Sequence, residues 1–316
     1  MTEISVVANQ VAEFFILMAV GFIAAKCRVL TRPIMEGLMK LIVKILLPCL
    51  ILKVVAGSGT TAADYAGNAD FAAAILTCYA LMFAAGTGAG KLFRKKGTTY
   101  NVFVAESTFG DMGFIGIPLL TAVLAGSGTS VAISVYTVID MALLWTLGVY
   151  LCSRHNKKTA GLPAVWRNTV SPTSVALAVG IVLVCFAVPV PGVLMGPVAL
   201  IGSTSTPLAL IYIGGMLSYV PVESLLRKKS IFGIVGIKMI VLPLAVFLAA
   251  GLFFGTKERM TLMYMVGLPA MTTVSMLAQL YGSDQEYATT TVFVTTLACI
   301  GTLPLITWLS ALMSAV

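Results

Sequence analysis

A carboxylate, three glycines and a proline lie in the middle of a stretch that is otherwise apolar enough to cross a membrane. The stretch covers residues 101–124, and its centre reads Gly110-Asp111-Met112-Gly113-Phe114-Ile115-Gly116-Ile117-Pro118. Glycine weakens a helix, and proline cannot donate a backbone hydrogen bond. Backbone groups freed by such a break cannot face hydrocarbon, so the segment should line a protein cavity or a water-filled path. The chemistry this predicts is the binding and passage of a polar solute.

Four acidic residues fall within apolar stretches of the chain, namely Glu13, Glu106, Asp111 and Asp140. At ~1.5 Å per residue, Asp111 and Asp140 lie near the middle of their expected helices. An isolated charge there costs at least ~2.5 kcal/mol, and carboxylates at such depth mark substrate, ion or proton pathways. We therefore expect Asp111 and Asp140 to contact substrate or a coupling ion. Glu106 and Glu13 lie nearer the helix ends, where a hydrated vestibule or a lysine could stabilise them.

Two lysines also fall at depth. Glu36, Lys40 and Lys44 recur every four residues and so share one helix face. Lys40 can extend toward the membrane surface, whereas Lys44 is too deep to do so easily. Lys44 should either neutralise a buried acid or attract a substrate carboxylate. Lys238 permits the same two interpretations, and structural pairing is favoured because it lies closer to the membrane edge.

Hydroxyl side chains follow a second interrupted stretch, residues 259–281. Thr272, Thr273 and Ser275 come shortly after Pro269. Hydroxyls beside a broken backbone are suitable ligands for a carboxylate or a desolvated cation. They could equally cap the carbonyl groups that the break exposes.

A polar stripe precedes Asp140 on its expected helix. Ser130, Ser134, Thr137 and Asp140 recur at steps of four, three and three, which places them on one face. We expect this face to point inward and the hydroxyls to make interhelical hydrogen bonds.

Composition supports a polytopic helical membrane protein. Mean hydropathy is +1.01, 59% of residues are hydrophobic and only 10% are charged. The net charge of +8 comes from short basic runs between apolar stretches, which indicates membrane topology and argues against a nucleic-acid partner. The single histidine, His155, and six scattered cysteines offer no metal-ligand or catalytic spacing. We expect neither an enzyme nor a metal or cofactor site.

Taking ~20 apolar residues per crossing, the sequence predicts a set of ten spans. They lie near residues 5–26, 33–55, 69–92, 101–124, 128–153, 172–189, 195–219, 230–253, 259–281 and 286–314. Most of the 20 lysines and arginines follow spans one, three, five and seven. By the positive-inside rule these loops are cytoplasmic, and both termini lie outside a bacterial inner membrane.

The ten spans divide into two halves of opposite orientation. Residues 1–153 form the first, 154–171 a basic cytoplasmic linker and 172–316 the second. Interrupted helices at corresponding places in two inverted halves point to a transporter's binding site. We therefore expect the site where spans four and nine cross, with Gly113, Pro118 and Pro269 at the breaks.

Four segments resemble the auxin efflux carrier family of bacterial membrane transporters, which includes malate and malonate transporters. They are Gly113–Pro118, Leu47-Pro48, Thr206–Ala209 with Gly214–Met216, and Leu268–Ala270 leading to Tyr281-Gly282. The resemblance implies two inverted five-helix repeats with crossed broken helices 4 and 9. It also implies a scaffold of helices 1, 2, 6 and 7, transport helices 3–5 and 8–10, and a homodimer through spans two and seven. The family usually carries asparagine where this chain has Asp111.

The expected function is secondary active transport of small organic anions by alternating access. Such anions are mono- or dicarboxylates like malate or malonate, or auxin-like acids. No P-loop occurs, so an ion gradient or the substrate's own gradient must drive transport. We expect Asp111 to bind the coupling proton, because a neutral acid would tolerate an approaching anion. The alternatives are a sodium site at Asp111 or Asp140, a cationic or zwitterionic substrate, a passive channel, and a non-transporting membrane sensor.

Overall fold

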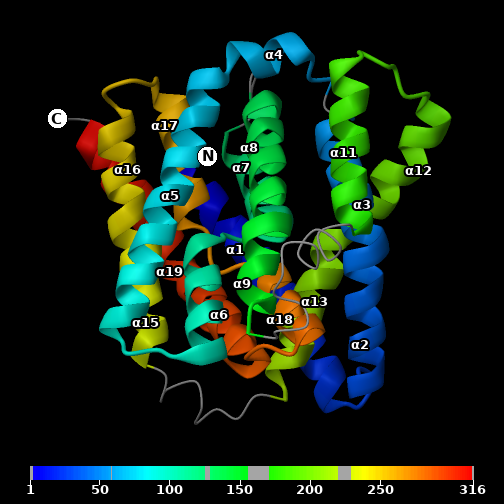
Figure 1. Cartoon of the computed structure of the whole chain (residues 1–316), viewed down its shortest axis with the longest axis vertical. Coiled ribbons are helices and arrows are strands. Elements are labelled where there is room, and N and C mark those ends of the chain that lie inside the picture. Colours follow the sequence, from blue (N-terminus) through cyan, green and yellow to red (C-terminus); the bar gives the residue numbers. More distant parts are fainter. Residues whose placement is uncertain (1–2, 58, 125–128, 156–170, 220–228, 315–316) are drawn as a thin grey trace.

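The computed structural model describes residues 3–57, 59–124, 129–155, 171–219 and 229–314, and its regular elements there are all helices (Figure 1). Residues 156–170, most of the predicted basic linker, lie outside this part. The helices are α1 Glu3–Lys26, α2 Arg32–Leu41, η1 Ile42–Leu46, α3 Leu47–Val55, α4 Ala62–Gly67, α5 Ala69–Leu92, α6 Gly97–Thr108, η2 Met112–Gly116, α7 Ile117–Val123, α8 Thr129–Leu143, η3 Leu144–Gly148, α9 Val149–Ser153, α11 Pro172–Cys185, α12 Gly192–Ser203, α13 Ser205–Leu217, α15 Lys229–Gly236, η4 Ile237–Val241, α16 Leu242–Ala250, α17 Thr256–Gly267, α18 Thr272–Tyr281 and α19 Gln285–Ser314.

Several helices, alone or joined end to end, are long and apolar enough to cross a bilayer. Within the described ranges there are six such stretches: Ser5–Lys26, Ala69–Leu92, Ser130–Ser153, Gly192–Leu217, Ser230–Ala250 and Gln285–Met313. Many of their large apolar side chains are exposed, as the lipid-facing side of a membrane helix requires. The chain is therefore an all-helical, multi-pass membrane protein. Shorter apolar helices, Met112–Val123 and Pro172–Cys185, accompany them.

Short π-helical segments carry the chain past its prolines. Of the four in the described residues, η1, η2 and η4 are each followed, after one residue, by Pro48, Pro118 or Pro243. Proline clashes with the carbonyl four residues earlier and lacks the N–H that would bond to it. The wider π turn moves that carbonyl away, so that the helix continues. The extra residue also changes which side chains share a face on either side of the turn.

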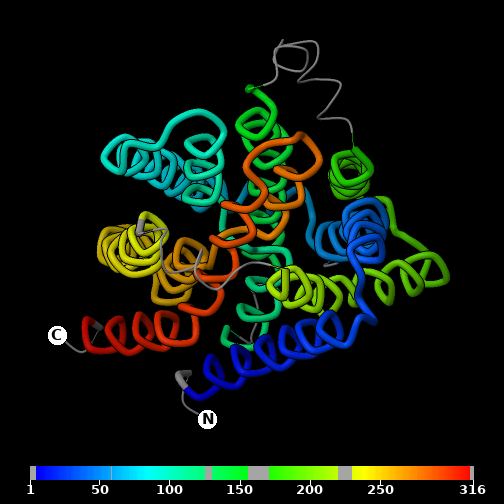
Figure 2. Tube along the Cα trace, turned by 90° about the horizontal axis from the view of Figure 1, so that it is seen from below, coloured from blue at the N-terminus to red at the C-terminus, as the bar shows by residue number. Residues whose placement is uncertain are grey.

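Glycines bring α1 and α13 into close contact. Gly21 of α1 packs on the backbone of Ile211, and Gly214 of α13 packs on the carbonyl of Met18. Figure 2 shows the two helices side by side, α1 in blue and α13 in yellow-green. The neighbouring Gly215 faces the Met35 side chain of α2. Gly214 and Gly215, which lie in span seven of the expected dimer contact, therefore pack against helices of their own chain.

We expect Gly214→Ala to lower the stability of the protein. The added Cβ would overlap the Met18 carbonyl oxygen, which is backbone and cannot move aside without displacing α1. Overpacking of this kind costs roughly 1–3 kcal/mol. Thermal unfolding of the purified protein in detergent measures the effect. Gly236→Ala is the matched control, because a Cβ there meets open space. Equal unfolding temperatures for the two variants would show that the α1–α13 contact tolerates separation.

Candidate functional site

Two chain breaks meet inside the molecule. Helix α6 ends at Thr108 and α17 ends at Gly267, in the two stretches where the sequence predicts interruptions. Beyond them, Gly110 and Ala270 pair in an isolated antiparallel β-bridge. The backbone N–H of Asp111 donates to the carbonyl of Pro269 at 2.9 Å. Each break thus supplies partners for backbone groups that the other has freed, as burial in a membrane protein requires.

The Asp111 carboxylate caps two helices at once. Asp111 is the N-terminal cap of η2, and its Oδ1 accepts a hydrogen bond from the N–H of Phe114 at 3.2 Å. Its Oδ2 accepts from the N–H of Thr272 at 3.1 Å and from the Thr272 hydroxyl. The N-terminal ends of η2 and α18 therefore converge on one carboxylate. A negative charge at a helix N-terminus is favourable, because the free N–H groups carry partial positive charge.

Lys238 stabilises the opposite end of the same break. It lies on η4 and is buried, and its Nζ donates to the carbonyl of Glu106 at 2.9 Å and to that of Phe109. These are carbonyl groups at the C-terminal end of α6, where partial negative charge accumulates and a cation is favourable. The sequence analysis favoured structural pairing for Lys238 but did not connect it with this break. No sequence signal gave its partner, because η4 and α6 lie far apart in the chain.

Glu106 is buried two residues before the end of α6. Its side chain is 0% exposed. Neither carboxylate oxygen has a well-formed hydrogen bond in the part of the chain that the structure describes. Lys238 contacts the backbone carbonyl of Glu106 but makes no hydrogen bond to its carboxylate. A carboxylate without hydrogen bonds in a protein interior is costly, so its ionisation state has to be explained.

Asp140 lies in a separate polar cluster. Its Oδ1 accepts a hydrogen bond from the Tyr79 hydroxyl, which lies 2.9 Å from the hydroxyl of Tyr136. The rings of these two tyrosines stack with centroids 5.8 Å apart. On the same helix Ser134 and Thr137 are buried, and the Ser134 hydroxyl lies 2.6 Å from that of Tyr65.

The predicted polar face is therefore present in part. Ser134, Thr137 and Asp140 point inward, as expected, whereas Ser130 is exposed. Ser134 makes the expected contact with another helix, and the Thr137 hydroxyl instead donates to the Ile133 carbonyl of its own helix.

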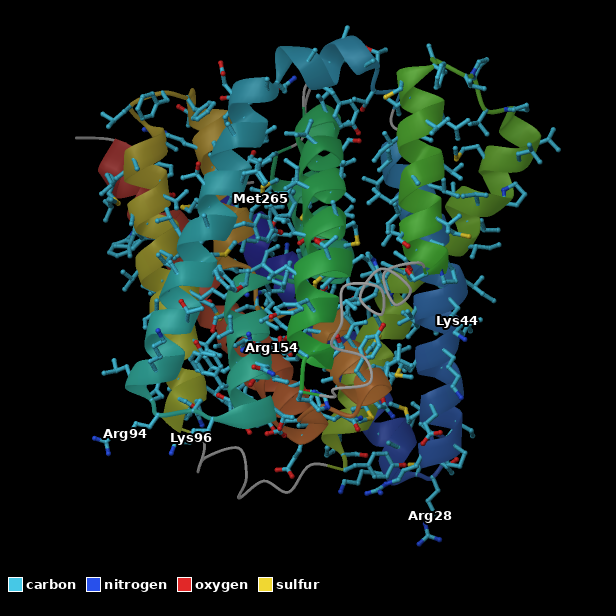
Figure 3. All side chains as sticks on the ribbon, in the orientation of Figure 1. Arg28, Lys44, Arg94, Lys96, Arg154 and Met265 are labelled. Carbon is cyan, nitrogen blue, oxygen red and sulfur yellow. The ribbon has the colours of Figure 1, made fainter. Side chains whose placement is uncertain are left out.

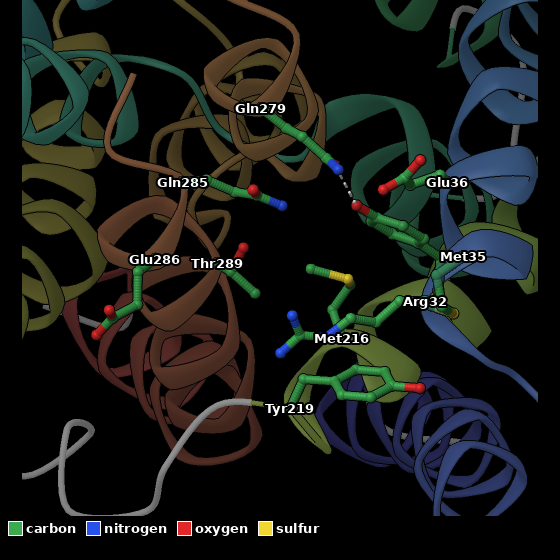
Figure 4. Close-up of a pocket in the computed structure, with 10 residues that line it drawn as sticks. Arg32, Met35, Glu36, Met216, Tyr219, Gln279, Gln285, Glu286 and Thr289 are labelled. Carbon is green, nitrogen blue, oxygen red and sulfur yellow. Dashed lines mark hydrogen bonds between the residues drawn. The ribbon is translucent and has the colours of Figure 1, made fainter. Parts of the chain in front are cut away.

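A cavity of about 260 Å³ lies toward the end of α18 that is opposite the Asp111 cap (Figure 4). It is bounded by α2, the end of α13, α18 and the start of α19, and its lining residues are Arg32, Met35, Glu36, Tyr212, Met216, Tyr219, Gln279, Gln285, Glu286 and Thr289. Figure 4 shows Arg32 and Gln285 pointing into the space. The Arg32 guanidinium stacks over the Tyr219 ring at 5.3 Å, and the Tyr212 hydroxyl donates to Gln279 Oε1 at 3.4 Å. Because α18 begins at the Asp111 cap and carries Gln279, one helix links the crossing to the cavity.

Comparison with known proteins identifies the kind of molecule that carries this site. A family model described as membrane transport protein matches residues 6–307. The chain belongs to the membrane transport protein family. It is also 25% identical over 317 aligned residues to a protein of Rhizobium meliloti (strain 1021) that is provisionally named a malonate transporter, and the match covers 94% of this chain and 93% of that protein. The protein is accordingly a membrane transporter and not an enzyme, and a transporter of this kind binds a small-molecule substrate.

Within this transporter, the structure gathers most of the residues that the sequence analysis selected. Asp111, Pro269 and Thr272 meet at the crossing, and Glu106 lies one turn away. Gly113 is buried in η2, and Pro118 follows in α7.

Thr273 and Ser275, two further predicted residues, are buried at the start of α18. The Ser275 hydroxyl donates to the Thr272 carbonyl at 3.0 Å. The Thr273 hydroxyl has no hydrogen-bond partner among the described residues.

Lys44 is not brought to the site. Its side chain is exposed on η1, and Figure 3 shows it at the outer side of the molecule. Glu36 and Lys40 are exposed as well, and Glu36 lines the cavity. Arg32 counts in the sequence only as one of the basic residues that follow the first predicted span, and its place in the cavity is not evident from the sequence. Helical spacing shows which residues share a face, but not what that face contacts.

We expect Asp111→Ala to destabilise the transporter strongly. The change leaves the N–H groups of Phe114 and Thr272 buried without an acceptor, at roughly 1–3 kcal/mol for each. Asp111→Asn should cost less, because its remaining oxygen can still serve one of the two helices. Thermal unfolding in detergent gives the comparison. Asp70→Ala is the control, since Asp70 is an exposed acid in the first turn of α5. A loss no greater than that of the control would contradict the capping role.

Proposed function

We propose that this protein is a secondary active transporter of small organic anions, working by alternating access and coupled to protons. The observation that carries the proposal is the position of the cavity. It separates α2 and α13, which correspond to predicted scaffold spans two and seven, from α18 and α19, which belong to the predicted transport helices. A solute site between a fixed and a moving domain is what alternating access requires.

The chemistry of the cavity supports an anionic substrate. Arg32 offers a guanidinium that can bind a carboxylate through two parallel hydrogen bonds, and the Gln279 and Gln285 amides can donate further ones. The provisional name of the Rhizobium meliloti relative assigns it to malonate, a small dicarboxylate. We therefore propose malonate and similar mono- or dicarboxylates, malate among them, as the substrate class.

The proposal includes an architecture. Two inverted halves, residues 1–153 and 172–316, would each contribute one broken helix to the crossing, and the protein would act as a homodimer. Arg28, Arg94 and Lys96 lie at the same end of the molecule (Figure 3), which supports a cytoplasmic assignment for that end. Arg28 lies in the loop after α1, and Arg32 begins α2 directly after that loop. Because Arg32 lines the cavity, the cavity would open to the cytoplasm. Both chain termini would then lie on the outer side.

Counterflow in proteoliposomes tests the function. We expect labelled malonate to exchange saturably against internal malonate, with malate competing, and to accumulate when a pH gradient is imposed. Saturation reflects a site that must reorient for each cycle, whereas flux that grows linearly with concentration would indicate a channel and contradict the proposal. Repeating the assay with and without sodium at fixed pH distinguishes proton from sodium coupling. Competition by amino acids in place of dicarboxylates would overturn the anionic substrate class.

We expect Arg32→Gln to raise the KM for malonate roughly tenfold. A hydrogen bond to a charged group contributes about 1.5–3 kcal/mol, and the lower end applies here because Arg32 is exposed to water. Arg28→Gln removes the same charge from the neighbouring loop, outside the cavity lining, and should leave the KM unchanged. Initial rates of counterflow at graded malonate concentrations give both values. Equal KM values for the two variants would remove Arg32 from the binding site.

A further inference from the structure

The interior of the molecule holds more negative than positive side chains. In the described part of the chain, Glu106, Asp111 and Asp140 are each 0% exposed, and Lys238, at 1%, is the only fully buried cation. With all four ionised, the interior would carry an excess of negative charge. Buried charges that lack partners are strongly disfavoured, and a carboxyl group escapes the cost by holding a proton. At least one of these acids should therefore be protonated in this state.

Two of the four groups make hydrogen bonds that favour their charged forms. Asp111 accepts hydrogen bonds from two backbone N–H groups and one hydroxyl, and a proton on either oxygen would compete with these donors. Lys238 donates to two backbone carbonyls, for which the ammonium is the best donor. Together they form a pair of opposite charges across the break in α6. Because Lys238 is the only fully buried cation in the described residues, no cation is left there to balance a second carboxylate.

Glu106 is the group with the weakest support for a negative charge. Asp140 keeps one hydrogen bond, from the Tyr79 hydroxyl, whereas neither oxygen of Glu106 has a well-formed one. The titratable groups that act on Glu106 come from three packed elements and its own break: Lys238 on η4, Cys152 on α9, Tyr287 on α19, and Asp111. Lys238 is the single cation among them, and it is already bound to the carbonyls at the end of α6.

We propose that Glu106 is the site of the coupling proton, while Asp111 has the structural task of holding the two broken helices together. The inference rests on the proposed proton-coupled anion transport. In the state described here, the Glu106 side chain is a neutral carboxylic acid. Its O–H proton passes to water on the side to which the transporter next opens, leaving a carboxylate beside Lys238. This replaces the earlier expectation that Asp111 carries the proton.

Protonation of Glu106 also explains how an anion and a proton would travel together. An ionised Glu106 adds negative charge near the crossing, and charges interact strongly at short range in a medium of low dielectric constant. A substrate carboxylate is then repelled. A neutral Glu106 removes this repulsion, so that anion binding and proton binding favour each other.

The test compares Glu106→Gln, Glu106→Asp and Glu13→Gln with the unchanged protein in malonate-loaded proteoliposomes. Glutamine imitates the protonated acid, so Glu106→Gln should keep counterflow at equal pH but lose accumulation driven by a pH gradient. Glu106→Asp should retain part of that accumulation. Glu13 is the control, because it is an exposed acid on α1 that accepts a hydrogen bond from Gln10. Accumulation that survives in Glu106→Gln would overturn the inference.

Infrared difference spectroscopy of the purified protein provides a readout that does not need transport. Spectra at acidic and alkaline pH should show the C=O band of a buried protonated carboxyl group, and this band should be weakened in Glu106→Gln and unchanged in Glu13→Gln. A band that is unchanged in Glu106→Gln but disappears in Asp140→Asn would assign the proton to Asp140 and overturn the inference.

The two measurements separate failure of this inference from failure of the proposed function. If no carboxylate is exchanged by the unchanged protein, anion transport is wrong, and the infrared band still decides whether Glu106 binds a proton. If malonate is exchanged saturably but no pH gradient drives it, anion transport holds and Glu106 is not a coupling site.

Discussion

The need to satisfy backbone groups away from water governs the centre of this structure. Two helices stop in the interior, and each stop frees N–H and C=O groups that lipid cannot bind. The Asp111 N–H and the Pro269 carbonyl pair with one another, the Asp111 carboxylate accepts from the N–H groups of Phe114 and Thr272, and the Lys238 ammonium donates to two carbonyls. The burial of α6 from Asn101 onward follows, because a break held this way has to be enclosed by protein.

The same arrangement orders the electrostatics of the interior. Helix N-termini carry partial positive charge and C-termini partial negative charge, and the structure sets a carboxylate at the first and an ammonium at the second. The positions of the Asp111 carboxylate and the Lys238 ammonium therefore follow from the direction of the half-helices and not from attraction between the two side chains. In the described part of the chain the Glu106 carboxylate caps no helix and has no well-formed hydrogen bond, which makes it different from Asp111 although both are buried acids in one segment.

Sequence patterns predicted the breaks and the buried acids because both depend on local chemistry. Glycine, proline and aspartate in an apolar stretch weaken a helix wherever it lies, and Asp111 and Thr272 were selected for that reason. The pattern could not distinguish a carboxylate that caps helices from one that carries a proton, because the difference lies in hydrogen bonds from α18, distant in the chain. Lys44 and Lys238 show the same limit. Depth along a helix can be counted in residues, whereas the direction of a side chain depends on neighbouring helices and on the π turn that contains it.

The double cap at Asp111 has a consequence for the empty protein. In many anion sites the ligand itself neutralises the converging helix ends, and its departure leaves them repelling one another. Here the chain supplies its own anion, so the converging helix ends have an internal partner that does not depend on cargo. In the proposed cycle, a carrier built in this way would return unloaded without rebuilding its centre, which is the step that net movement of a solute requires and that strict one-for-one exchange does without.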